Sequence, residues 1–304
     1  IDGYIDSLNI MTDEIIWQVN SRHAEGAGLE PVTSLVGTVD VAALADDLGT
    51  DFHFSADHYQ SGGQFEIVAY DASGNVTHTF TINPAADTVQ SLRDEINAEV
   101  AAGGLNELTA SLTGGASGNF QIRANGAYTF AIRPSSTTDS SNALSILGVN
   151  TFFSWEETTG QPFTDVTQTL GVNSALVADS GMIAAGTLDS NNRVAPGSNS
   201  VALDIAAVRD LVIEDLGGTG INTTIDAYYS SFIAGVGIDV QNANMNEKFN
   251  DTLLSQYVQR KESITGINLD EEMAEILKFQ HLYQAAAKII STCDDMMQAL
   301  LSIK

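Results

Sequence analysis

The sequence predicts an α+β protein in which both chain ends form a bundle of long helices and a β-rich domain containing one helix is inserted between them. Two observations lead to this fold class. Apolar residues recur with a helical period over about the first 24 residues and again after residue 201, whereas alternate residues are apolar in the middle of the chain. Helical ends on either side of a β-rich middle favour ends that pack together and a middle that projects.

The first segment predicts an amphipathic helix from Ile1 to about Ala24, because its apolar residues recur at spacings of three, four and seven. Gly26 and Gly28 then end the helix. The apolar positions that define its expected buried face are Ile1, Ile5, Leu8, Ile15 and Val19.

The middle of the chain, from about Phe52 to Trp155, changes to a period of two. Residues 65–69 and 120–124 alternate and predict half-buried strands. Residues 71–75 predict a hairpin connection, and two further turns are expected at Gly114-Gly115 and Asn125-Gly126. One helix is expected inside this region, capped by Asp87 with Gln90 and burying Val89, Leu92, Ile96 and Val100.

The C-terminal part predicts two long helices, one from near Ile225 to Arg260 and one from Leu269 to the end of the chain. In the last helix, apolar residues repeat every seven positions in two rows, which is typical of a coiled coil. Periodicity alone fits an ordinary buried bundle helix equally well. We name the two rows the C-terminal seam: Ile276, Phe279, Tyr283, Ala286, Ile290, Cys293, Met297 and Leu300.

The charge of the chain excludes two classes of partner. It has 12 Lys and Arg against 39 Asp and Glu, a formal charge of -27, so nucleic acid and anionic membranes would repel it. No apolar stretch is long enough for a membrane helix, and we expect no membrane insertion. The single cysteine, Cys293, excludes an intramolecular disulfide and any multi-thiolate metal site.

No catalytic, cofactor or metal site is expected. His53 and His58 with Asp51 and Asp57 are the one cluster of metal-ligand residue types, and its spacing favours solvated polar groups. The glycine-rich residues 217–220 lack the Lys-Ser or Lys-Thr of a phosphate-binding loop and predict a helix-joining loop. No Gly-x-Ser-x-Gly nucleophile motif is present.

The residues around the start of the last helix carry a resemblance to a known family. The run Gly266, Asn268, Leu269, Asp270, Glu271 and Glu272, followed by Gln280 and Tyr283, resembles the C-terminal signature of the flagellar hook-associated proteins of the hook–filament junction. Hook and rod proteins close similarly but have a shorter acidic stretch. Weaker similarity to the family covers Val19-Asn20 with His23 and Gly26, and the residues 175–186 with 197–199. The residues 88–97 with 147–150 are similar to an insert seen among flagellins and hook-associated proteins.

The resemblance implies a structural protein of the bacterial flagellum, extracellular and exported without a cleaved signal peptide. It would be an adaptor that joins hook to filament by self-assembly through its terminal helices, and not an enzyme. The implied partners are copies of itself, the hook protein, the second junction protein and an export chaperone. The family's N-terminal helices are not found before Ile1, so we expect a truncated chain.

The same reasoning divides the chain into four parts. Residues 1–50 and 166–263 are expected to form a helical axial domain, residues 51–165 an inserted β-rich outer domain, and residues 264–304 a coiled-coil assembly helix.

Two alternatives belong to other function classes. The chain could be a secreted binding module whose β-rich domain binds a glycan or host ligand, using the aromatic residues Tyr59, Phe152, Phe153 and Trp155. It could also be a hydrolase with an unfamiliar fold, which would need a pocket with converging titratable groups.

Overall fold

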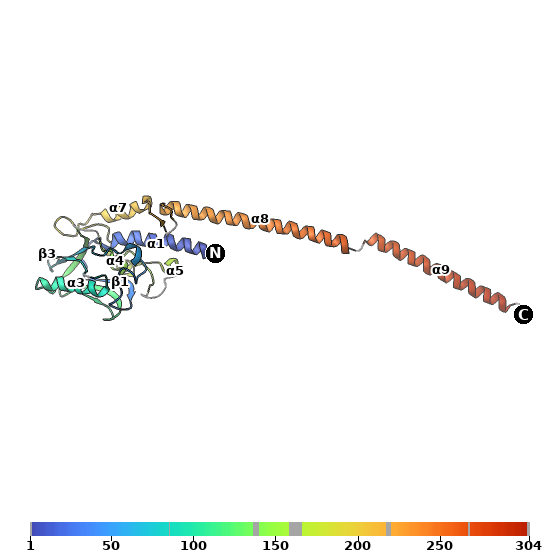
Figure 1. Cartoon of the computed structure of the whole chain (residues 1–304), viewed down its shortest axis with the longest axis horizontal. Helices are drawn as coiled ribbons and strands as arrows, with labels where there is room; N and C mark the ends of the chain where they lie inside the picture. Colours follow the sequence, from blue (N-terminus) through green and yellow to red (C-terminus); the bar gives the residue numbers. More distant parts are fainter. Residues whose placement is uncertain are drawn as a thin grey trace. The chain divides into compact units, whose positions relative to one another are not determined.

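The computed structural model describes residues 2–84, 86–135, 140–157, 166–216, 220–266 and 268–302. It divides into two compact units, Ile1–Ile233 and Ala234–Lys304. The first unit combines helices with antiparallel sheets, and the second consists of helix (Figure 1). The predicted α+β class is therefore confirmed. The packing of the two chain ends into one bundle, and the finer division into four parts, stay predictions.

The first unit contains two three-stranded antiparallel sheets. One has the strand order β1-β5-β4 and the other β3-β2-β6. The strands expected at residues 65–69 and 120–124 are confirmed, as are the three turns. The strands are β1 (Ser34–Val41), β2 (Phe65–Tyr70), β3 (Val76–Ile82), β4 (Leu108–Leu112), β5 (Gly118–Ala124) and β6 (Thr129–Pro134).

Strand β1 was not expected. Residues 34–41 were assigned to the N-terminal helical part, but they pair along β5 from Ser34 to Val41, with an irregularity between Val36 and Asp40. One strand of the β-rich part thus lies among residues 1–50, which were expected to be helical.

Helix α3 (Val89–Ala102) covers the sheets from one side, and its predicted buried face of Val89, Leu92, Ile96 and Val100 is confirmed. The predicted cap was wrong by one residue. The Thr88 hydroxyl accepts a hydrogen bond from the Ser91 amide, as an N-cap does. Asp87 instead accepts hydrogen bonds from the Tyr59 and Ser61 hydroxyls.

Strand β2 is buried on both faces, whereas its alternation predicted a half-buried strand. One face contributes to the main core. On the other face Val68 and Tyr70 lie beneath Leu188 and Val194. Glu66 lies on this second face too, and its charge is paired with Arg133 at 2.7 Å. The polar residue that suggested a solvated face is thus a buried ion-pair partner.

Helix α1 (Asp2–Ala24) is confirmed as a helix, but its predicted buried face was wrong. Of the expected positions, Ile5 is exposed, the other three described ones are partly covered, and Ile1 lies outside the described residues. The face that is buried carries three polar residues among apolar ones, so its pattern is not amphipathic. Its buried members are Thr12, Ile16, Trp17, Asn20, His23 and Ala24.

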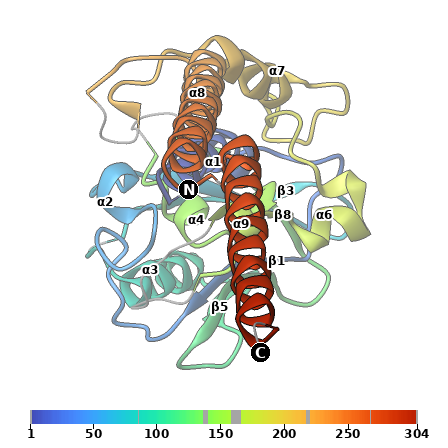
Figure 2. The same cartoon turned by 90° about the vertical axis from the view of Figure 1, so that its right-hand side faces the viewer.

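The shorter elements surround α1. It contacts α4 (Ala143–Ile146), α5 (Val166–Thr169), β7 (Phe153–Ser154) and α7 (Ser200–Ala207), and Figure 2 shows α4 beside it. The remaining short elements of the described chain are α2 (Ser55–His58), β8 (Gly171–Val172), α6 (Ser174–Ala178) and two single 3₁₀ turns at Ser180–Met182 and Val208–Asp210.

The two long C-terminal helices are confirmed. Helix α8 (Ile225–Thr265) has 41 residues and α9 (Leu269–Leu301) has 33. Of the loop predicted at residues 217–220, the first three residues lie outside the described residues. Among the described residues, no helix combines the length and the apolar character needed to span a membrane.

The charge distribution generates the first prediction. Residues 1–233 hold six arginines, no lysine and 29 Asp and Glu, and so carry 23 of the chain's 27 net negative charges. Repulsion among these charges destabilises the compact state, and salt screens it. We expect the melting temperature of the main unfolding transition to rise as NaCl increases from about 0.05 to about 0.5 M. KCl should raise the melting temperature in the same way. A melting temperature that stays constant or falls would contradict this.

Candidate assembly interface

Helix α9 begins after a break that the sequence imposes at Gly266. The Gly266 amide donates a hydrogen bond to the Glu262 carbonyl at 2.6 Å. A Cβ atom added at Gly266 would lie 2.2 Å from that carbonyl oxygen, which is closer than any real contact. Any other residue would therefore have to change the turn that ends α8, and this explains the glycine of the signature.

Asn268 starts the new helix. Its side-chain oxygen accepts a hydrogen bond from the Asp270 amide at 3.2 Å, and its carbonyl accepts from the Glu272 amide at 3.0 Å. Asp270, Glu271 and Glu272 occupy the first turn, where the helix dipole favours negative charge by about 0.3–1 kcal/mol per exposed side chain. Gly266, Asn268 and the acidic residues 270–272 of the signature thus have a common local role, which is to end one helix and begin the next.

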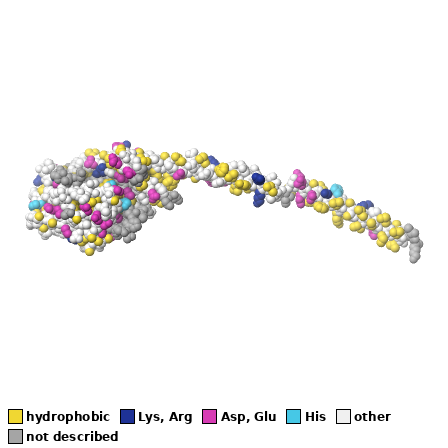
Figure 3. All heavy atoms as spheres, viewed as in Figure 1, with side chains coloured by type: hydrophobic (Ala, Val, Ile, Leu, Met, Phe, Trp, Pro, Cys, Tyr) yellow, Lys and Arg dark blue, Asp and Glu magenta, His cyan; other side chains and the backbone are white. Residues whose placement is uncertain are grey.

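The C-terminal seam is exposed along the whole of α9. No residue of α9 is buried, and the exposed fraction is 78% for Tyr283, 70% for Ile290 and 62% for Met297. Figure 3 shows hydrophobic side chains following the visible face of this helix. A shallow apolar depression lies on it, lined by Ile276, Phe279, Gln280, Leu282 and Tyr283.

The exposure extends over the whole seam. Ala286 and Cys293 are exposed as well, and a second apolar row of Leu282, Ile289 and Met296 lies beside the seam. Soluble proteins seldom leave a continuous apolar stripe of this length in water unless a partner covers it. The geometry makes α9 a candidate interface, and the role of each seam residue in assembly stays a prediction.

A second feature, which we call the α1 joint, anchors α1 in the first unit. The Asn20 side chain donates to the Phe153 carbonyl at 3.0 Å and accepts from the Phe152 and Phe153 amides at 3.0 and 2.8 Å. The Asn150 side chain donates to the carbonyls of His23, Ala24 and Gly26 at 3.0–3.2 Å. These bonds satisfy carbonyls at the helix end that would otherwise have no intrahelical partner.

The joint brings together segments that resembled the family separately in the sequence. His23 bonds to both Asn150 and the Ala184 amide. Gly148 has a φ of +67°, and a side chain there would collide with Thr38. Sequence reasoning noticed Asn20, His23 and the residues 147–150 only as isolated matches. Their mutual contacts were missed because hydrogen bonds between distant segments leave no periodic signal.

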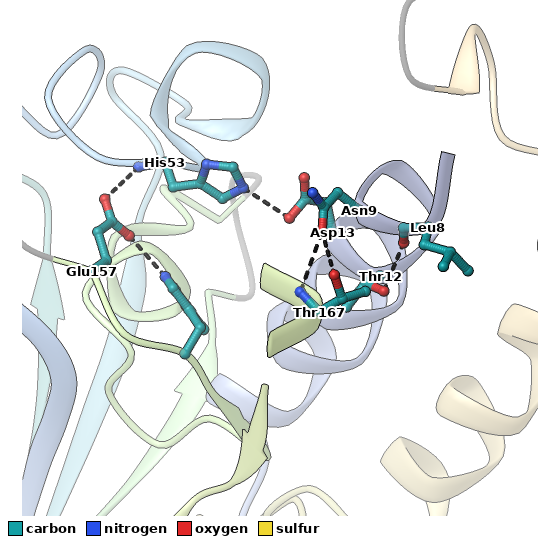
Figure 4. Close-up of polar contacts among 8 residues, drawn as sticks. Leu8, Asn9, Thr12, Asp13, His53, Glu157 and Thr167 are labelled. Carbon is teal, nitrogen blue, oxygen red and sulfur yellow. Dashed lines mark hydrogen bonds and ion pairs between the residues drawn. The ribbon is translucent and has the colours of Figure 1, made fainter. Parts of the chain in front are cut away.

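The predicted cluster of metal-ligand residue types forms packing contacts. The His53 ring nitrogen lies 2.8 Å from the Asp13 carboxylate, and its backbone amide donates to Glu157 (Figure 4). The His58 ring stacks on Trp17 with 3.9 Å between ring centroids. Both histidines are partly buried, so the description as solvated groups was wrong. No three His, Cys, Asp or Glu side chains converge as metal ligands in the described part of the chain.

The cap of α9 generates the second prediction. Asn268→Ala removes the side-chain acceptor, and loss of such a cap costs about 0.5–2 kcal/mol. We expect the Asp270 amide to exchange faster with solvent and the first turn of α9 to lose helical chemical shifts in the intact chain. Asn268→Asp keeps the acceptor and should behave like the native chain. Equal exchange in Asn268→Ala and the native chain would show that the cap does not start this helix.

The C-terminal segment that contains the candidate interface is similar to known proteins. Residues 259–303 match a family model described as the C-terminal domain of the flagellar basal body rod FlgEFG proteins. The match covers the end of α8, the break at Gly266 and all of α9. It therefore contains the whole C-terminal seam.

The chain is also similar to curated flagellar proteins. The chain is 30% identical to flagellar hook-associated protein 1 of Bacillus subtilis over 83 residues, which are 27% of this chain and 16% of that protein. It is 27% identical to the Salmonella typhimurium protein of that name over 85 residues, and 28% identical to the Escherichia coli one over 76 residues. These matches span about a sixth of each relative's length. The chain is thus similar to flagellar hook-associated protein 1 and carries a C-terminal segment similar to that of the flagellar rod proteins.

Proposed function

We propose that this chain is a structural component of the bacterial flagellum, an adaptor that joins hook to filament by self-assembly through its terminal helices. One observation supports the proposal most strongly. The exposed apolar seam of α9 lies entirely within the residues that match the rod-protein family model. An exposed stripe alone is ambiguous, and family similarity alone does not identify a surface.

The energetics suit assembly. Fully burying one large apolar side chain contributes about 1.5–3 kcal/mol, and α9 offers such side chains at Ile276, Phe279, Tyr283, Ile290 and further along the same face. Several buried seam residues per copy would offset the entropy lost on association. The proposed partners are copies of the chain alongside, the hook protein below, the second junction protein above, and an export chaperone before secretion. The proposed location is extracellular.

The first unit would be the part that does not join the helical contacts. It folds around its own core, and its strong negative charge keeps copies soluble and apart. The proposed role of this unit is structural.

The aromatic residues do not support the alternative function, a glycan-binding module. Trp155 is buried and donates to Glu157, and its ring packs edge-on against Phe54. The Tyr59 hydroxyl donates to Asp87. These side chains are structural contacts of the first unit and do not form an exposed aromatic platform.

The decisive substitution is Ile290→Glu, at the centre of the seam. Because Ile290 is 70% exposed, the change should leave the melting transition of the purified chain where it is. In an assembled interface it would place a charge among apolar groups, and the desolvation penalty adds to the lost burial. In cells that carry the variant in place of the native protein, we expect hook–filament joints to fail in electron micrographs and motility to be lost.

Ser291→Glu is the matched control, since it adds the same side chain one residue further on and away from the seam. It should preserve joints and motility. Normal motility in the Ile290→Glu strain, or equal loss in both strains, would overturn the seam as the interface.

A further inference from the structure

His23 occupies the centre of the α1 joint with no exposure to solvent. Its Nε2 atom lies 2.9 Å from the Ala184 amide nitrogen, and its Nδ1 atom lies 2.7 Å from the Asn150 carbonyl oxygen. The Phe152 ring packs edge-on at 5.7 Å between centroids. One imidazole thus connects α1 to two segments more than 120 residues away in sequence.

The two partners determine where the ring proton lies. A backbone amide can only donate, so Nε2 must accept from Ala184 and carries no proton. A carbonyl can only accept, so Nδ1 carries the proton and donates it to Asn150. This neutral tautomer satisfies both bonds. A second proton on Nε2 would point at the Ala184 N–H and would turn an acceptor into a second donor.

The surroundings offer a charged ring no compensation. The two segments packed against it, residues 148–153 and 181–186, contain no ionisable side chain. On its own helix, Arg22 donates to Gln18 and interacts with Asp204, and just after the helix Glu25 accepts from Ser140. Burial lowers the pKa of His23 from its ordinary value of 6.5, and the Asn150 hydrogen bond offsets part of this effect.

Residues 181–186, which accept this contact, have four described backbone hydrogen bonds to other segments. Ala27 and Gly186 exchange two, at 2.7 and 3.4 Å, the Leu29 amide donates to the Gly181 carbonyl at 2.8 Å, and the Ala202 amide donates to the Ala185 carbonyl at 3.0 Å. The sheets, by contrast, have their own continuous hydrogen-bond ladders. Loss of the His23 bond therefore has a local consequence, and the segment around Ala184 can separate from α1 while β2 and its neighbours stay paired.

We propose that His23 is an acid-sensitive lock, and that protonation of its ring releases the segment around Ala184 from the end of α1. The lock is independent of the assembly seam, because it lies wholly in the first unit. Acidic surroundings would loosen the attachment of residues 183–186 without dismantling the core.

The sign of the pH effect follows from the lowered pKa. The released state takes up a proton more readily than the closed state, so the lock is complete above pH 6.5 and weakens as the pH falls from 6.5 toward the lower pKa of the closed state. Glu25 acts in the opposite direction, because burial raises its pKa to about 7 and its protonation favours the folded state. The test must therefore compare chains that differ only at His23.

The experiment is amide hydrogen exchange of the intact chain between pH 7 and about pH 4.5, corrected for intrinsic exchange rates. In the native chain we expect the protection of the Ala184 amide to fall about tenfold per pH unit below 6.5 until the closed-state pKa is reached. The β2 amides should keep their protection over the same range, which separates local release from unfolding.

His23→Gln supplies a non-titrating acceptor, and its Ala184 protection should not depend on pH in this way. His281→Gln, which removes an exposed histidine from α9, should behave like the native chain. Should His23→Gln fail to fold, the ring nitrogen spectrum of the native chain still decides the case. A protonated Nε2 at pH 7, or Ala184 protection in the native chain that does not change with pH, would overturn the lock.

Discussion

The first unit depends on the hydrogen bonds that close the C-terminal end of α1. The last carbonyls of a helix have no partners within it, and here the Asn150 side chain binds two of them, those of His23 and Ala24, while Asn20 and His23 bind the segments opposite. Because these bonds are buried, each unmade one would cost the desolvation of a polar group. They fix where α1 ends, where the chain turns at Gly26, and which face of α1 meets the sheets.

The position of α1 also determines which of its side chains enter the core. Ile16 and Trp17 join the cluster formed by α3 and the two sheets, and Trp17 provides the platform on which His58 stacks. The loop from Leu188 to Val194 covers the second face of β2, where Glu66 and Arg133 form their buried pair. The first unit is therefore closed on itself, and most of its apolar side chains have partners within the chain.

The second unit has the opposite character. Its side chains are arranged with the regularity of a packed helix, yet none of those described in α8 or α9 is buried. A 33-residue helix with an acidic first turn and an asparagine cap is well started by local interactions, but helices in water derive most of their stability from burying an apolar face. The helix termini of this unit have their local interactions, but its apolar faces have no partner in the described structure. This is the property expected of a part that packs only in an assembly.

Local pattern was enough to determine much of this protein. The two long helices, the break at Gly266, the heptad rows of α9, the buried face of α3 and the hairpin at residues 71–75 all follow from spacing, caps and turn residues, which act within a few positions of the chain. The buried face of α1, strand β1 and the choice of Thr88 over Asp87 as cap were decided only by the tertiary structure. In each of these, a contact distant in sequence outweighs the local pattern: Asn20 and His23 are buried because residues 150–153 and 184 satisfy them, β1 exists because β5 pairs with it, and Asp87 is bound to Tyr59.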